Sequence, residues 1–169
     1  MTHDLDDISV YACWTRLNET PEDIARMSMR FMKEFSPRIK TGPWEPLEGE
    51  WDGTEAGLVE VIKRNPITDD DGEPIPGDGY YFTLNNDRGP LNTDFNVRTG
   101  TNRLIERVAS PRFAQKYYHS EHASASELWD ASVHAAVMAF DPAFVTGQER
   151  AVLRMTRRGE WKIPFGDRV

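Results

Sequence analysis

Cysteine is almost absent from this chain of 169 residues, in which Cys13 is the only one. A single cysteine excludes an intrachain disulfide and any zinc site built from several cysteines. Long apolar runs are also lacking, since no stretch approaches the roughly 20 apolar residues of a membrane-spanning helix. Residues 1–7 are acidic, whereas a secretion signal would have an apolar centre. We therefore expect a protein of the reducing cytoplasm with no membrane partner.

Catalytic and cofactor-binding motifs are missing as well. The sequence contains no Gly-x-Ser-x-Gly, no phosphate-binding glycine-rich loop ending in Lys and Ser or Thr, and no dinucleotide fingerprint. Cys13 lies in an apolar, β-branched stretch, which favours a small core residue over a nucleophile. We therefore expect no cofactor, no resident metal and no enzymatic activity.

One histidine pair keeps an enzymatic alternative open. His119 and His122 are three residues apart, so both would share one face if this segment were helical. A catalytic zinc site needs a third protein ligand and a general base, and the sequence offers no convincing third ligand. The favoured interpretation is a surface loop or a helix start, and the alternative is a small metal-dependent hydrolase that uses this pair.

Basic residues are scarce in the middle of the chain. The whole sequence has 20 lysines and arginines against 28 acidic residues, a net charge of −8. Residues 41–87 contain twelve acidic residues and only Lys63 and Arg64 as bases, so this span accounts for the whole acidic excess. Because a nucleic-acid backbone needs a basic surface, direct nucleic-acid binding is not expected. The acidic span is either a solvated region that aids solubility or a face that attracts a basic partner.

The clearest element is an amphipathic helix over residues 21–35. Thr20 suits the N-cap position, and Pro21 suits the first helical position. Ser36-Pro37 ends the helix. Its apolar stripe, at helical spacing, consists of Ile24, Met27, Phe31 and Phe35.

Two further helices and several strands complete the pattern. Thr54 predicts a cap for a short helix over 55–64, and Ser124 or Ser126 predicts the cap of a helix that ends near Phe140. The segment 149–155 fits a helix or a strand, 110–123 is an uncertain connection, and 65–79 is too rich in turn residues for a regular element. Strands are predicted over 8–15, 80–84, 91–98, 103–109, 143–146 and 161–165.

The order of these elements predicts an α+β fold. The three strands between 79 and 109 form an antiparallel meander in this prediction, and the helices cover one face of the sheet. No linker is long enough to divide the chain, so we expect a single domain over residues 1–169.

Aromatic and turn residues recur at characteristic spacings over most of the chain. They are Tyr11, Trp14, Arg16, Glu19, Thr20, Ala25, Arg26, Phe31, Pro37, Trp44, Gly79, Phe82, Leu84, Trp129, Asp141, Pro142, Gly159, Glu160 and Trp161. This pattern resembles bacterial immunity protein family 52, whose members occur beside polymorphic toxins and neutralise them. A Gly-Trp pair that the family has near its C-terminal end is divided here by Glu160.

The resemblance implies a binding protein without enzymatic activity, whose partner is a cognate toxin, typically with a nuclease domain. A nuclease holds phosphates on a basic surface, so an acidic inhibitor can occupy that surface in their place. Trp44 and Trp51 are either hot-spot anchors ringed by charge or core residues. The residues that we expect to contact the toxin are Trp44, Glu45, Glu48, Glu50, Trp51, Asp52, Asp69, Asp70, Asp71 and Glu73.

Overall fold

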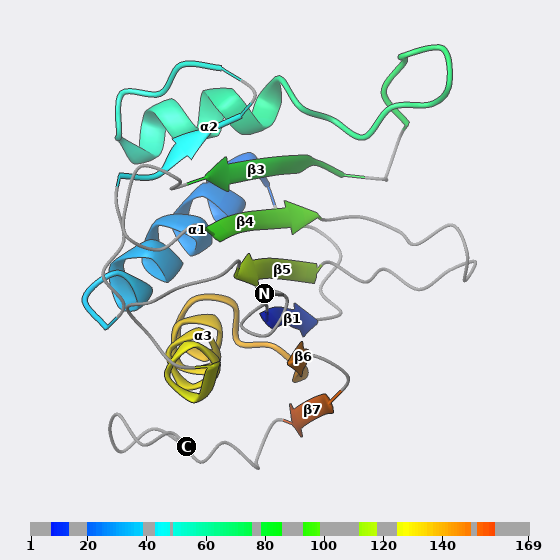
Figure 1. Cartoon of the computed structure of the whole chain (residues 1–169). Helices are drawn as coiled ribbons and strands as arrows, with labels where there is room; N and C mark the ends of the chain where they lie inside the picture. Colours follow the sequence, from blue (N-terminus) through cyan, green and yellow to red (C-terminus); the bar gives the residue numbers. More distant parts are fainter. Residues whose placement is uncertain are drawn as a thin grey trace, which may run out of the picture.

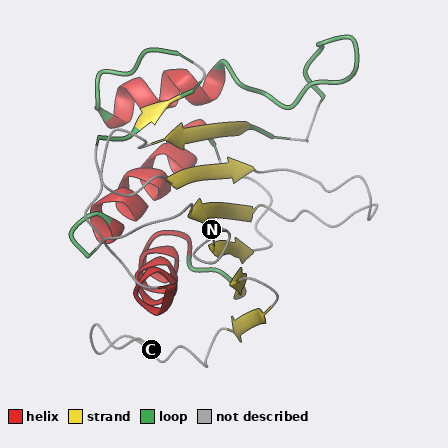
Figure 2. Ribbon diagram, viewed as in Figure 1, coloured by secondary structure: helices red, strands yellow, loops and turns green. Residues whose placement is uncertain are grey.

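The structure is a computed structural model that describes residues 8–13, 20–38, 43–47, 49–75, 79–85, 93–98, 112–117, 125–149 and 152–157. Within these ranges, three helices and a set of short strands alternate along the chain (Figure 1 and Figure 2). In chain order they are β1 (Ile8–Cys13), α1 (Pro21–Phe35), β2 (Glu45–Pro46), α2 (Glu55–Lys63), β3 (Tyr81–Asn85), β4 (Thr93–Arg98), β5 (Arg112–Tyr117), α3 (Ala125–Phe140), β6 (Phe144–Glu149) and β7 (Val152–Arg157).

All the described strands belong to one antiparallel sheet, in the order β2-β3-β4-β5-β1-β6-β7. The first strand of the chain therefore lies in the middle of the sheet, between β5 and β6. Phe82 is paired with Val97, and Ala12 with Val145. All four side chains are fully buried. Because side chains alternate between the faces of a strand, these residues define the buried face.

The helices pack on that buried face. Helix α1 crosses the half of the sheet formed by β3 to β5, α3 lies beside β1 and β6, and α2 runs along the β2–β3 edge (Figure 1). Helix α1 lies between the other two helices and contacts both. This arrangement confirms the predicted α+β class, with an antiparallel sheet and helices packed against it.

Helix α1 has the bounds that the sequence predicts. The Thr20 hydroxyl accepts a hydrogen bond from the Asp23 N–H at 3.1 Å, and the Asp23 carboxylate accepts one from the Thr20 N–H at 3.0 Å. This reciprocal capping box satisfies two N–H groups that the helix itself leaves unpaired. Ile24, Phe31 and Phe35 are fully buried, and Met27 is partly buried against the same core.

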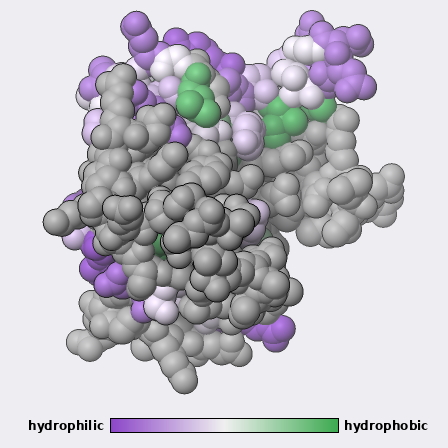
Figure 3. All heavy atoms as spheres, viewed as in Figure 1, coloured by the Kyte–Doolittle hydropathy of each residue, from purple (hydrophilic) through white to green (hydrophobic). Residues whose placement is uncertain are grey.

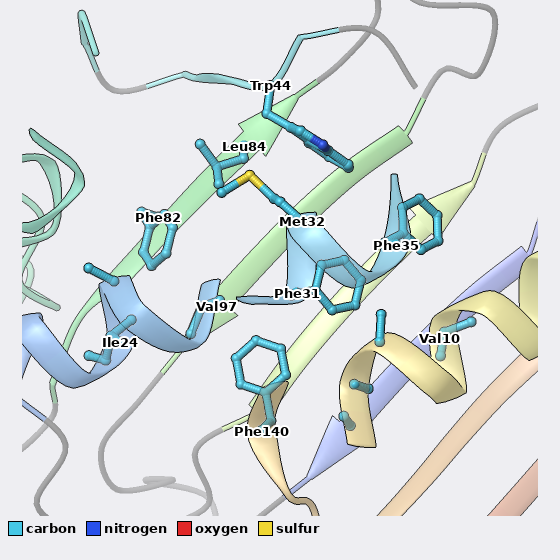
Figure 4. Packing of buried hydrophobic residues seen from close by; sticks show 14 of the residues in the cluster. Val10, Ile24, Phe31, Met32, Phe35, Trp44, Phe82, Leu84, Val97 and Phe140 are labelled. Atoms are coloured by element: carbon cyan, nitrogen blue, oxygen red, sulfur yellow. The ribbon is translucent and has the colours of Figure 1, made fainter. Parts of the chain in front are cut away.

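Aromatic rings join the two long helices (Figure 4). The Phe31 and Phe35 rings are stacked, with centroids 5.4 Å apart, and Phe31 also meets Phe140 of α3 at 6.0 Å. On the sheet side, Phe82 and Leu84 of β3 point towards α1 (Figure 4). The apolar stripe that the sequence predicts is therefore the surface on which both α3 and the sheet pack.

The other two helices agree with the sequence in most details. Thr54 caps α2, since its hydroxyl accepts a hydrogen bond from the Gly57 N–H at 2.9 Å. Helix α3 ends at Phe140, as predicted, where Asp141 has a φ of 45° and Pro142 follows. Asp tolerates this left-handed conformation better than most residues. Ser126 lies inside α3 and is not its cap, and Ser124 lies outside the described residues.

The strand predictions need one correction. The neighbour of β4 is β5 at Arg112–Tyr117, within the segment that the sequence analysis leaves as an uncertain connection. The segment 103–109, predicted as the third strand of the meander, lies outside the described residues. The ambiguous segment near 149–155 contributes strand β7. β5 is a strand because it pairs with β1, about 100 positions away in the sequence, and a local pattern does not contain that information. β7 is a strand because it forms a hairpin with β6, the strand directly before it. The predicted strand 161–165 lies outside the described residues.

Candidate functional site

Trp44 is a core residue that anchors the start of the acidic span. It is 9% exposed, and its ring meets the edge of Phe35 with centroids 6.3 Å apart. Its indole N–H donates a hydrogen bond to the Ser36 hydroxyl at 3.2 Å. Burial of Trp44 favours its interpretation as a core residue over that of an exposed interface anchor. A large apolar ring close to a hydrophobic helix end gains more from burial than from exposure.

Trp51 supports the turn before α2. It is partly buried against the core, and its indole N–H donates to the Thr54 carbonyl at 2.8 Å. The neighbouring Asp52 carboxylate accepts hydrogen bonds from the Thr54 N–H at 2.9 Å and from the Thr54 hydroxyl at 2.6 Å. These two hydrogen bonds from Thr54 hold the pKa of Asp52 below its usual value. The Asp52 side chain therefore stays charged at neutral pH on the surface.

The first group of predicted acidic residues lies around these two tryptophans. Glu45, Glu50 and Asp52 are exposed, and Glu48 lies outside the described residues. Leu47 stands among them with 66% of its surface exposed, the highest value among the large apolar residues that the structure describes. Its N–H donates to the Thr83 carbonyl at 3.0 Å, so its backbone is fixed against β3. The sequence analysis missed Leu47, because a lone leucine in a loop carries no signal of exposure.

The second group of acidic residues lies on the loop between α2 and β3, which projects from the body (Figure 1). Its described residues, 65–75 and 79, form no helix or strand, but two isolated bridges, Pro66 with Tyr80 and Thr68 with Pro74, hold the two sides of the loop together. The Ile75 N–H also donates to the Ile67 carbonyl at 2.9 Å. The loop thus behaves as a narrow hairpin whose tip lies at residues 69–73.

Asp69 organises the tip of this loop. Its carboxylate accepts hydrogen bonds from the Asp71 and Glu73 N–H groups, both at 2.9 Å. Its carbonyl accepts a third from the Gly72 N–H at 3.0 Å, and Gly72 has a φ of 83°, a conformation that favours glycine. The exposed carboxylates of Asp70, Asp71 and Glu73 are therefore displayed by a fixed turn, and Asp69 is the residue that fixes it.

The two acidic groups lie at opposite ends of α2, which contributes acidic residues of its own. A helix of nine residues spans about 14 Å, so the two groups are separate patches of one elongated surface. Figure 3 shows hydrophilic residues gathered over α2 and over the projecting loop. We call this surface the acidic edge, and its exposed, described members are Glu45, Glu50, Asp52, Glu55, Glu60, Asp69, Asp70, Asp71 and Glu73.

Two basic side chains, Lys63 and Arg64, accompany the acidic residues in the described span between Glu45 and Ile75. Lys63 lies 3.4 Å from Glu60 and 3.8 Å from Glu22, and all three side chains are about half exposed or more. Exposed pairs of this kind are worth roughly 0–1 kcal/mol and are weakened by salt. Arg64 is the other basic residue of the span between Glu45 and Ile75. Between Glu45 and Ile75, the nine exposed carboxylates of the acidic edge therefore outnumber the two basic residues.

The remaining candidates add no second site among the residues that the structure describes. His119 and His122 lie outside the described residues. Within the described ranges, no three His, Cys, Asp or Glu residues are placed to bind a metal ion together. None of the helices in this part of the chain combines the length and the apolar character needed to cross a membrane. No protein-family model matches the sequence, and no curated protein matches it either.

Proposed function

We propose that this chain is an immunity protein, which binds a cognate bacterial toxin through the acidic edge and so neutralises it. The observation that carries the proposal is the display of nine exposed carboxylates by fixed backbone along α2 and its flanking segments. The resemblance to immunity protein family 52 supplies the class of partner. The cytoplasm is the proposed compartment, and nuclease chemistry is the proposed activity of the toxin.

A basic nuclease surface fits the acidic edge in charge. Carboxylates spaced along such an edge can take the place of backbone phosphates and keep substrate out. Because Asp69 and Thr54 already hold their turns in place, little loop ordering is needed on binding. Preorganised surfaces lose less conformational entropy in a complex.

In this proposal Leu47 is the apolar anchor of the interface, a role that the sequence analysis offered to Trp44 and Trp51. It is exposed, fixed through its backbone, and close in sequence to Glu45 and Glu50. An apolar side chain surrounded by charge can be desolvated at the centre of an interface. Trp44 and Trp51 contribute by supporting the segment rather than by contact.

The test uses the full chain and the toxin encoded beside its gene, with association rates measured at low and at high ionic strength. The variant Asp70→Asn/Asp71→Asn keeps Asp69 and with it the turn. We expect its association rate at low salt to fall severalfold and its dependence on salt to become flatter. A matched control, Glu127→Gln/Asp130→Asn, removes two exposed charges of α3 and should bind like the wild type.

Leu47→Asn is the complementary variant. It should speed dissociation while leaving the salt dependence of association in place, because it removes an apolar contact and leaves the net charge unchanged. Equal rates and equal salt slopes for the wild type, the Asp70→Asn/Asp71→Asn variant, the Leu47 variant and the control would refute the acidic edge as the interface. A wild-type chain that fails to inhibit the toxin would refute the immunity function itself.

A further inference from the structure

His134 is a buried histidine at the contact between α1 and α3. It is 5% exposed, and its ring nitrogen Nε2 is approached by two groups of opposite charge. The Oε2 atom of Glu34 lies 3.1 Å from Nε2, and the Nη2 atom of Arg38 lies 2.7 Å from it. Both partners come from the end of α1 and the turn after it, about 100 positions away in the sequence.

These two contacts place opposite demands on one nitrogen atom. A hydrogen bond from Arg38 requires a bare Nε2 with its lone pair, because the guanidinium only donates. A hydrogen bond to Glu34 requires a proton on Nε2, because a carboxylate only accepts. A single proton position on Nε2 cannot satisfy both contacts. Because the contact with Arg38 is the shorter of the two, we assign the proton of the neutral ring to Nδ1, so that Nε2 accepts from Arg38, and uptake of a second proton at Nε2 then transfers the hydrogen bond to Glu34.

We propose that His134 is a pH-dependent switch, in which protonation of the ring decides whether Nε2 is hydrogen-bonded to Arg38 or to Glu34. In the neutral ring with a bare Nε2, the nitrogen accepts from Arg38 and holds the turn after α1. In the doubly protonated ring, Nε2 donates to Glu34, and the positive charge repels Arg38 from the helix contact. The proton comes from solvent and returns to it, and no other bond changes.

The charged residues around the His134 ring are consistent with two hydrogen-bonding states. Arg30 holds the other oxygen of Glu34 at 3.0 Å. Burial raises the pKa of Glu34, but the hydrogen bonds from His134 and Arg30 outweigh it, so that pKa lies below its usual value. Glu34 is therefore a carboxylate over the whole range in which a histidine titrates.

The other elements packed on α3 present few charges near this point among the residues that the structure describes. On the sheet side, β1 and β6 place the apolar Val10, Ala12 and Val145 on the buried face. One turn before His134 on α3 itself, Asp130 is exposed to solvent. Among the described groups, Glu34 and Arg38 are the charged residues in contact with the ring, with Arg30 behind Glu34.

Release of Arg38 would act on the connection to the acidic edge. The Arg38 N–H donates to the Phe35 carbonyl at 3.1 Å, within the turn that follows α1. The same turn contains Ser36, whose hydroxyl accepts from the Trp44 indole. The Trp44 indole N–H is thus a natural reporter of the turn, two hydrogen bonds away from the titrating ring.

The experiment is a pH titration of the full chain by NMR, which follows the ring protons of His134 and the indole N–H of Trp44. In the wild type, the indole signal should shift with the same midpoint as His134. Arg38→Gln should raise the His134 midpoint, because a nearby positive charge disfavours protonation, and Glu34→Gln should lower it, each by about one pH unit or more. In Arg38→Gln, the indole signal should no longer follow the ring.

Arg26→Gln serves as the control, because Arg26 pairs with Asp23 near the other end of α1 and should leave both midpoints unchanged. A His134 midpoint that is insensitive to Arg38→Gln, or that moves downwards, would overturn the proposed switch. So would an indole signal that ignores the titration of His134 in the wild type. If Glu34→Gln does not fold, the wild type and Arg38→Gln decide the question by themselves.

Discussion

Phe31 of α1 meets Phe140 of α3 with ring centroids 6.0 Å apart and an interplanar angle of 37°. Both rings are fully buried, and Phe31 also stacks on Phe35. This contact joins α1, which packs on β3 to β5, to α3, which packs beside β1 and β6. It therefore connects the helices that cover the two halves of the sheet. The loss of the Phe31 ring should therefore affect the whole fold rather than one helix.

Phe31→Ala should lower the free energy of unfolding by about 3–5 kcal/mol, because it removes a buried ring and leaves a cavity. Chemical denaturation followed by tryptophan fluorescence measures the change. Lys33→Ala, two positions along the same helix and exposed, is the control and should stay within about 0.5 kcal/mol of the wild type. A loss well below 1 kcal/mol for Phe31→Ala would show that this face of α1 is not the packed one.

The capping box of α1 predicts a dependence of stability on pH. The hydrogen bond from the Thr20 N–H, followed by that from Arg26, holds the pKa of Asp23 below its usual value. A group whose pKa is lower in the folded state stabilises the fold above its ordinary pKa, and this stabilisation disappears as the pH falls through the folded value. Asp23→Asn should therefore be less stable than the wild type at pH 7 and approach it in strong acid.

Unfolding curves of the two proteins at neutral and at strongly acidic pH measure this difference. Glu22→Gln is the matched control, since Glu22 lies in the same helical turn but outside the capping box. Its stability should differ from the wild type less than that of Asp23→Asn at neutral pH. A gap for Asp23→Asn that is as large in acid as at neutral pH would contradict the ionic origin of the effect.

Gly57 and Asp52 form a coupled pair at the start of α2. A Cβ atom added to Gly57 would overlap the Asp52 carboxylate and lie 3.1 Å from the Thr54 hydroxyl oxygen. Gly57→Ala should therefore push Asp52 away from Thr54 and forfeit their hydrogen bonds, although alanine ordinarily stabilises a helix interior by roughly 0.5–1 kcal/mol relative to glycine. In an Asp52→Ala background the same substitution should recover that gain.

A double-mutant cycle on thermal or denaturant unfolding measures this coupling. The wild type, both single variants and the double variant are needed, and the effect of Gly57→Ala should be more favourable in the Asp52→Ala background. An identical effect of Gly57→Ala in the two backgrounds would show that the helix start adapts without the carboxylate.

Local patterns in the sequence specify the helices closely. The bounds of α1 follow from a capping box and an apolar stripe, and those of α2 from the cap Thr54, because both signals join residues three or four positions apart. The acidic character of residues 41–87 is also visible without a structure. What the pattern did not show was that Asp69 uses its carboxylate to shape the loop, since adjacent aspartates look alike in the sequence.

The sequence by itself determined the α+β class, the three helices and the concentration of charge, because caps, periodicity and composition are properties of short segments. Only the tertiary structure decided that β1 lies between β5 and β6, that Trp44 is buried while Leu47 is exposed, and that His134 meets Glu34 and Arg38. These outcomes depend on which apolar surfaces, distant from one another in the sequence, pack together and exclude water. Strand pairing and burial are settled by the free energy of the whole packed core, which no local window of the sequence contains.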